Sequence, residues 1–305
     1  MSRSRLPVRA VGFLRREGPV SAARSAVAAA RFQSWKQYKT RLEPSAHQAV
    51  HRLRYGTAAP ERYGLIHVDP RSIEYLLVPH FWNRVSKFTT HVTDGDWDEN
   101  RTNERLMISS KRDDGDRPTL FRIDNYLLYV SAVEHFRNGT PWEETEVYEW
   151  LMDEWLQRDP ETYMNRYGSE RRVRSRLDGI DDLYDHIRQH GYLTQEELRE
   201  REDAPFHSPA LAPQHHEIAV NIGRDGRMIF DDGRHRFIVA RILGLESIPV
   251  RVLVRHAEWQ ELRTEVSDAV SMSDLSPRAV KHLDHPDLQD VIPGSIRDER
   301  GDVTR

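Results

Sequence analysis

Hydrophobic and polar residues alternate most regularly in the last third of the chain. Between residues 217 and 233, EIAVNIGRDGRMIFDDG gives two alternating runs joined by Gly-Arg-Asp-Gly, a sequence typical of a β-hairpin. A helical run, FIVARILGL, follows and closes at Gly244, and IPVRVLV at 248–254 has the composition of a strand. This succession of hairpin, helix and strand predicts a mixed α/β unit.

The chain upstream of this unit shows weaker patterns. Alternation in GLIHVDP predicts a short strand that ends at Pro70, because proline cannot donate to the ladder, and a further strand is expected at about 119–123. Apolar residues at helical spacing predict a helix over 141–156 with a buried tryptophan stripe, and another helix that stops at Gly191. The residues from His285 onward are polar and predict a loose tail.

The first 54 residues carry a charge very different from that of the rest. They contain 12 Arg and Lys against 2 Glu, a net charge of +10, which leaves −14 on the other 251 residues. Helical spacing predicts one short helix before Gly18 and a second over about 21–42. A basic amphipathic helix can lie on an anionic membrane, contact nucleic acid or dock on the acidic body of its own protein, and the sequence leaves all three open.

Composition excludes several classes of protein. The 305 residues, 38% of them hydrophobic, are enough to bury a core. The longest apolar stretches, such as 127–130 and 237–240, fall far short of the roughly 18 residues that span a bilayer, and no signal-peptide pattern is present. We therefore expect a soluble, cytoplasmic protein without a transmembrane segment. The absence of cysteine excludes thiol catalysis, disulfides and cysteine-ligated metals.

The segment DDGRHR, at 231–236, gathers groups that bind phosphate. Gly233 lets the backbone approach a ligand, and the N–H groups and dipole at the start of the following helix favour an anion. The side-chain donors of this turn are Arg234, His235 and Arg236. Asp231 and Asp232 could hold a divalent metal or accept a proton from a substrate hydroxyl. The alternative is that Asp232 only caps the helix, while the arginines are solvated or paired.

The run DGRHRFIVARILGLESIPVRV resembles the phosphate-binding box of the ParB/sulfiredoxin superfamily. That box reads approximately as Asp-Gly-x-His/Arg-Arg, three variable residues, Ala, then Gly and an apolar strand. The matching positions are Asp232, Gly233, His235, Arg236, Ala240 and Gly244. The resemblance extends from Asp178 to Arg255 and implies a mixed α/β, ParB/sulfiredoxin-like core.

The resemblance also implies how the chain is divided. The core is expected at 178–260. A basic helical extension is expected at 1–60, a first core strand with a mainly helical insertion at 61–177, and a helix with a polar tail at 261–305.

The chain differs from individual branches of this superfamily, and these differences exclude some of the functions that the resemblance would otherwise imply. Sulfiredoxins carry a catalytic cysteine where this chain has Arg234, and chromosome-partitioning proteins follow the box with a helix-turn-helix domain that is not predicted after Arg255. The free-serine kinases carry Asp-Gly-His-His-Arg, which differs from this box at one position. Their catalytic glutamate follows an early strand. Glu74 lies at a similar place in this chain, although its spacing matches that of the family only loosely. The resemblance therefore implies a nucleotide-dependent kinase or phosphotransferase that acts on a small hydroxyl-bearing acceptor.

In this expectation, the turn from Gly233 to Arg236 binds the phosphates of ATP, ADP or CTP. Asp231 and Asp232 hold Mg²⁺, and Asp232 and Glu74 are the catalytic carboxylates that orient the acceptor hydroxyl. Two alternatives remain open: a ParB-like nucleic-acid-binding protein or nuclease that uses the basic N-terminal segment, and a non-catalytic nucleotide sensor.

Two further clusters, one of aspartates and one of histidines, match the patterns of metal sites only in part. Asp94, Asp96 and Asp98 begin like a calcium loop, but glycine and glutamate are missing from the positions where that loop requires them, so an arginine-paired or solvated turn is expected. His215 and His216 are adjacent, and in a strand their side chains would point to opposite faces, which disfavours a shared zinc ion.

Overall fold

The computed structural model describes most of the chain after the basic N-terminal segment. The described residues are 43–61, 64–81, 85, 89–107, 117–155, 169–201 and 213–301. Both helices predicted before residue 43 lie outside them. No helix in the described part of the chain is long and apolar enough to cross a membrane.

One mixed sheet of eight strands organises the described residues. The strands are β1 (Leu65–Val68), β2 (Tyr75–Val78), β3 (His91–Thr93), β4 (Arg101–Thr102), β5 (Thr119–Arg122), β6 (Ile218–Ile222), β7 (Met228–Asp232) and β8 (Ile248–His256). Their order is β1-β8-β6-β7-β2-β5-β4, and β3 pairs with the end of β8 beyond β1. The fold is therefore of the mixed α/β class, as the sequence predicts.

The C-terminal unit of the sheet has the predicted succession of elements. The turn between β6 and β7 closes with a hydrogen bond from the Gly226 N–H to the Gly223 carbonyl, at 3.0 Å. Helix α7 (Arg234–Leu243) follows β7 and ends at Gly244, whose left-handed φ of +67° allows the chain to turn into β8. The predicted hairpin, helix and strand are confirmed.

Strands β1 and β2 come from the predicted segment 61–177, yet they pair with β8 and β7 of the predicted core. The segments 61–177 and 178–260 thus contribute to a single sheet.

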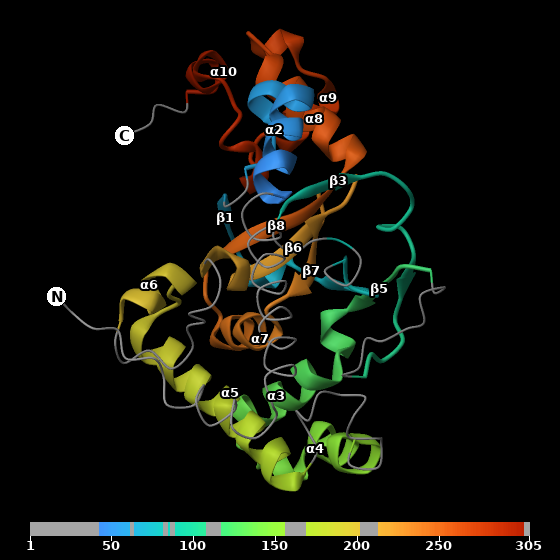
Figure 1. The fold of residues 1–305 in the computed structure, drawn as a ribbon, viewed down its shortest axis with the longest axis vertical. Coiled ribbons are helices and arrows are strands. Elements are labelled where there is room, and N and C mark those ends of the chain that lie inside the picture. The colour runs from blue at the N-terminus through green and yellow to red at the C-terminus, as the bar shows by residue number, and fades with distance from the viewer. Residues whose placement is uncertain are drawn as a thin grey trace, which may run out of the picture.

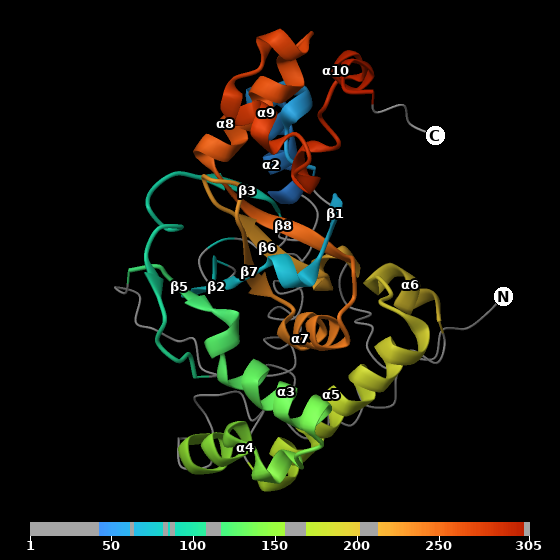
Figure 2. The ribbon, with the colours of Figure 1, turned by 180° about the vertical axis from the view of Figure 1, so that it is seen from behind.

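Helices lie at both ends of the molecule, with the sheet and α7 between them (Figures 1 and 2). The group near β3 is α2 (Glu43–Tyr55), α8 (Ala257–Asp268), α9 (Pro277–His282) and α10 (Gly294–Glu299). The opposite group is α3 (Leu127–Asn138), α4 (Glu146–Trp150) and α5 (Glu170–His190), with α6 (Gln195–Glu200) beside it. Helix α7 packs against α3 and α5, so the end of β7 faces the second group.

The two faces of the sheet bury different cores because neighbouring strand residues point to opposite sides. Leu76, Val220 and Phe230 pack with Phe237 of α7 and Ile180 of α5 in the larger core. The smaller core on the other face contains Leu77, Phe81, Trp97, Leu120, Ile229 and Leu253.

Two sequence predictions are wrong in detail. The helix predicted over 141–156 is a 3₁₀ turn (Trp142–Glu144), the short α4 and a π-helical turn (Leu151–Trp155). The predicted loose tail contains a 3₁₀ turn, η10 (Pro286–Leu288), and α10. Its apolar residues Leu288, Val291, Ile292 and Ile296 are buried, so this short segment contributes to the core.

Candidate functional site

Gly233 forms the junction between β7 and α7. Its φ of +90° lies in the left-handed region, and a Cβ atom there would stand 2.9 Å from the Cα atom of Ile218 in β6. Gly233 is the N-cap of α7, and no side chain caps this helix end. Asp232 accepts a hydrogen bond from the adjacent Gly233 N–H at 2.8 Å. The alternative in which Asp232 caps α7 is therefore wrong.

A cavity of about 360 Å³ opens at this uncapped helix end. Its lining residues are Arg176, Gly179 and Leu183 of α5, Gln195 of α6, His216, and Asp232 to Arg236. Arginines therefore come to it from two helices, and Asp232 is the carboxylate among these lining residues. The combination of a helix N-terminus with several guanidinium groups favours a ligand with more than one negative charge.

The guanidinium group of Arg236 is bound mainly by other residues of the protein. Its Nη2 atom donates to Glu217 Oε2 and to the Leu193 carbonyl, both at 3.0 Å, and its guanidinium stacks on the Tyr192 ring at 4.5 Å from the centroid. The ion pair with Glu217 is buried, with 11% and 1% of the two side chains exposed. Burial raises the pKa of Glu217, and the charge of Arg236 opposes that rise. Arg236 therefore positions the walls of the cavity.

His235 and Arg234 occupy the first turn of α7 beside the cavity. Burial lowers the pKa of His235 to about 3, assisted by the positive charges of Arg176 and Arg234, so its imidazole is neutral at pH 7. Arg234 donates to the Tyr126 hydroxyl at 3.4 Å. Its charge also acts on His80, whose pKa burial lowers to about 3. The positive charge at this turn is thus carried by guanidinium groups.

The structure does not bring Asp231 to the cavity. Its carboxylate, in a residue only 1% exposed, accepts hydrogen bonds from the Phe81 N–H at 2.9 Å and from the Asn221 side chain at 2.7 Å. The lining includes Asp232 but not Asp231. Asp231 therefore does not form the predicted metal pair with Asp232, because its carboxylate fastens the segment after β2 to the sheet.

Glu74 is also remote from the turn at Gly233 to Arg236. It directly precedes β2, and β2 runs parallel to β7 with Tyr75 opposite Ile229. Glu74 is therefore level with Met228, four residues or about 13 Å before Asp232 along β7. Its carboxylate is exposed and lies 3.7 Å from Arg122. The structure does not support Glu74 as a partner of Asp232.

The sequence analysis missed three residues around the site. Arg176 lines the cavity from α5, and Glu217 holds Arg236. Arg251 of β8 is 3% exposed; burial lowers its pKa, while the charges of Asp232, Asp231 and Glu217 oppose this. An arginine inside the otherwise apolar strand IPVRVLV was the available signal for a buried polar site beneath α7.

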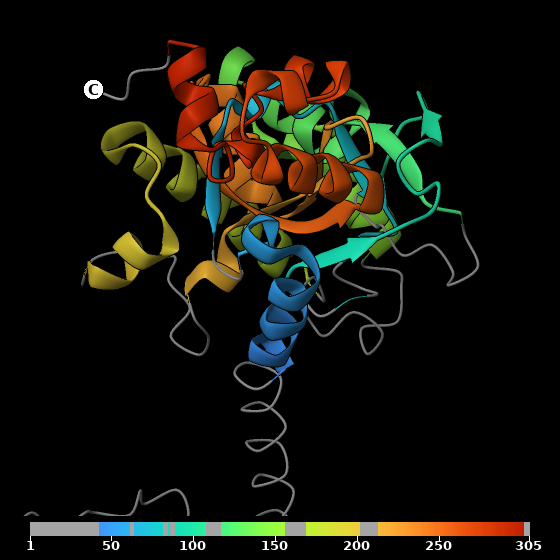
Figure 3. The ribbon, with the colours of Figure 1, turned by 90° about the horizontal axis from the view of Figure 1, so that it is seen from above.

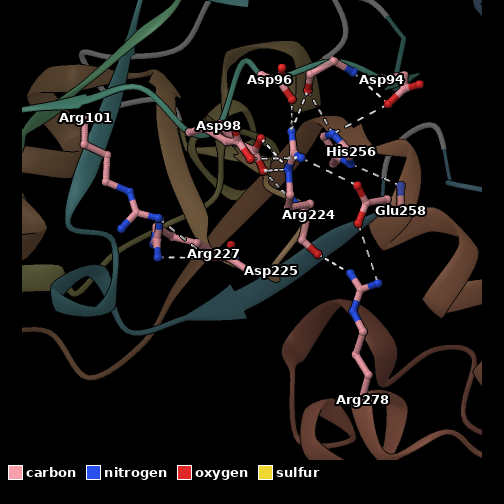
Figure 4. A network of polar contacts seen from close by, with 12 residues as sticks. Asp94, Asp96, Asp98, Arg101, Arg224, Asp225, Arg227, His256, Glu258 and Arg278 are labelled. Atoms are coloured by element: carbon pink, nitrogen blue, oxygen red, sulfur yellow. Dashed lines mark hydrogen bonds and ion pairs between the residues drawn. The ribbon is translucent and has the colours of Figure 1, made fainter.

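The two other clusters do not form metal sites. Figure 4 shows Asp96 and Asp98 of the 94–98 turn directed at Arg224, whose backbone N–H and Nε donate to the buried Asp98 and whose Nη2 donates to Asp96. Asp94 lies instead beside His256, at 3.9 Å. The arginine-paired interpretation of this turn is confirmed. His215 and His216 lie in a 3₁₀ helix (Pro213–His216), not a strand. No group of three histidine or carboxylate residues within the described ranges is arranged to hold a metal ion.

Magnesium in nucleotide sites is commonly held by one or two carboxylates together with the phosphates of the ligand. Asp232 fits that arrangement as a single carboxylate that lines the cavity at the start of α7. Comparison of the chain with protein-family models, with curated proteins and with solved structures found no match.

Proposed function

We propose that this protein binds a nucleoside di- or triphosphate at the start of α7 and transfers a phosphoryl group to a small hydroxyl-bearing acceptor. The observation that carries the proposal is the uncapped N-terminus of α7, which opens on a cavity lined by arginines from two helices. Helix N–H groups and guanidinium groups together bind phosphate oxygens with little rearrangement. The resemblance of 178–255 to the ParB/sulfiredoxin superfamily supports the same assignment.

Phosphoryl transfer requires charge neutralisation and alignment, and the lining offers groups for both. Arg176 and Arg234 neutralise the phosphate oxygens, while the neutral His235 contributes a hydrogen bond without further charge. Asp232 accepts a hydrogen bond from the acceptor hydroxyl or, with the nucleotide phosphates, would hold Mg²⁺. That ion, when bound, supplies additional neutralisation of the transferring group.

A non-catalytic nucleotide sensor is the second candidate. The observation that favours it is that neither Glu74 nor Asp231 lines the cavity, so Asp232 is the single predicted carboxylate beside the phosphate-binding turn. Binding would then change the cavity walls without turnover.

Nucleotide binding is tested with ATP, CTP, ADP and CDP plus Mg²⁺, followed by thermal shift and calorimetry. We expect Arg176→Ala and Arg234→Ala each to lower affinity at least tenfold, about 1.4 kcal/mol, by removing a charge-assisted phosphate contact. Arg188→Ala is the matched control, since Arg188 is on α5 but pairs with Asp185 at the surface. Unchanged affinity in both folded cavity variants would refute the site.

Catalysis is tested separately with Asp232→Asn. Because Asp232 does not cap α7, we expect this variant to keep its stability and its nucleotide affinity within a few-fold. If Asp232 orients the acceptor or Mg²⁺, phosphate release or transfer falls by orders of magnitude. Nucleotide binding without turnover by the wild type, across candidate acceptors, would favour the sensor.

A further inference from the structure

A cluster of imidazole rings holds α2 to the body of the protein. His47, His51 and Tyr55 follow one another at intervals of four residues on one face of α2, and His91 of β3 faces them. The ring centroids lie 5.6 Å apart for His47 and His51 and 5.2 Å apart for His47 and His91. His51 is buried, whereas Leu53 of the same helix is 89% exposed. The histidine face of α2 is therefore its inner face.

The charges that act most strongly on His51 are positive. They come from His47 and Arg54 of α2, His91 of β3 and Arg255 of β8. Burial, followed by these charges, lowers the pKa of His51 to about 4.

Arg255, one of these positive charges, already has a carboxylate partner in η10. Asp287 accepts hydrogen bonds from Arg255 and from Trp259. On the next turn of α2, Tyr55 faces Glu261 of α8. A proton on His51 would therefore enter a buried site where the strongest neighbouring charges are positive.

The chain directly after α2 has its own anchor. The Ala58 carbonyl accepts hydrogen bonds from Gln260 at 2.9 Å and Arg263 at 3.2 Å of α8. Gly56 separates this anchor from α2, with a φ of +55° and no atom within 4 Å of where its Cβ would be. Figure 3 shows α2 projecting away from the rest of the molecule. Gly56 is therefore the candidate hinge between α2 and the anchored segment 57–58.

We propose that His47, His51 and His91 form an acid-sensitive latch, which holds α2 against β3 and β8 when His51 is neutral and releases it when His51 is protonated. The direction of the pH dependence follows from the linkage between protonation of His51 and docking of α2. Docking lowers the pKa of His51 from 6.5, so docking is strongest above pH 6.5 and weakens as the pH falls toward 4. Over that interval the docking equilibrium constant falls by up to tenfold per pH unit. Metal chemistry is not invoked, because no metal-holding group of three such residues occurs in the described part of the chain.

Spin labels on the full-length protein test the latch, since the chain has no cysteine and accepts unique labelling sites. Labels at Ala49→Cys, on exposed α2, and Val270→Cys, beyond α8, report the distance between helix and body. We expect one distance at pH 7.5 and a growing longer, broader population between pH 6.5 and 4.5. Circular dichroism verifies that the fold persists over this range. A wild-type distance that stays constant to pH 4.5 overturns the proposal.

Substitution identifies the titrating group. In the labelled background, His51→Phe keeps a ring that cannot be protonated, and His51→Gln keeps a neutral polar group; at least one is expected to stay docked at pH 5. His190→Phe is the matched control, because His190 also has a histidine neighbour four residues away, His186, but lies on α5. Opening of both His51 variants over the wild-type pH range overturns the proposal. So does stabilisation by Zn²⁺ that is lost in both variants, which would identify a metal site.

Discussion

Replacement of Gly233 by alanine probes the junction that shapes the candidate site. Its φ of +90° makes an L-residue unfavourable by about 1–2 kcal/mol. The added Cβ would also stand 2.9 Å from the Ile218 Cα and 3.1 Å from its Cγ1. Because Ile218 belongs to a central buried strand, its backbone cannot move away freely, and such overpacking costs about 1–3 kcal/mol. We therefore expect Gly233→Ala to lose about 2–5 kcal/mol of unfolding free energy.

Gly244→Ala supplies the matched control at the other end of α7. Gly244 also has a positive φ, +67°, but no atom lies within 4 Å of where its Cβ would be. Only the conformational cost of about 1–2 kcal/mol applies there, and a less flexible unfolded chain offsets part of it. The difference between the two variants, about 1–3 kcal/mol, is the cost of the contact with Ile218.

Urea unfolding followed by circular dichroism and tryptophan fluorescence measures both variants, with the slope against denaturant checked for constancy. Nucleotide titration of the folded proteins should show weakened binding in Gly233→Ala, because relief of the clash displaces the first turn of α7. Gly244→Ala should bind like the wild type. Equal destabilisation of the two variants would refute the argument that β6 makes glycine necessary at 233.

Asp98→Asn should cost about 1–3 kcal/mol of stability, because its buried carboxylate accepts two hydrogen bonds from Arg224. Asp96→Asn, whose side chain is 65% exposed, should cost less than about 1 kcal/mol, and equal losses in chemical denaturation would contradict this difference. Asp287 should make the free energy of unfolding depend on pH in the acid range. Burial alone would raise its pKa, but the charge and hydrogen bonds of Arg255 help lower it from 3.8 to about 2. Its contribution of about 2 kcal/mol is present above pH 3.8 and lost as the pH falls toward 2; an Asp287→Asn variant with the same pH dependence would disprove it.

Local patterns explain which parts of the fold could be predicted. The β6–β7 hairpin, α7 and β8 are consecutive, and their glycines mark the turns, so alternation and spacing were sufficient. The pairing of β1 with β8 joins distant segments, and a strand of four residues carries too little pattern to specify its partner. The apolar residues of the last segment, among them Leu288 and Ile296, are few and lie between prolines and charges, which concealed their burial.

The residues of the candidate site likewise fall into those that the sequence could predict and those that it could not. The residues from Asp232 to Arg236 are contiguous, so the motif located them together. Arg176 is one arginine among many on exposed helices, and its approach to α7 depends on how α5 packs. The remoteness of Glu74 follows from the register of β2 against β7, which the sequence of β2 does not encode.

The strand order also determines when the sheet can form during protein synthesis. Val68 of β1 pairs with Ile248 of β8, so about 180 residues are added after β1 before its neighbour exists. At roughly 5–20 residues per second, this interval lasts about 10–40 s. The hairpin, α7 and β8 need only one another and can assemble as soon as they emerge from the ribosome. The nascent chain therefore carries β1 unpaired throughout this interval, whereas β2 can pair with β5 as soon as residues 119–122 have been made, and β8 then supplies the neighbour that β1 requires.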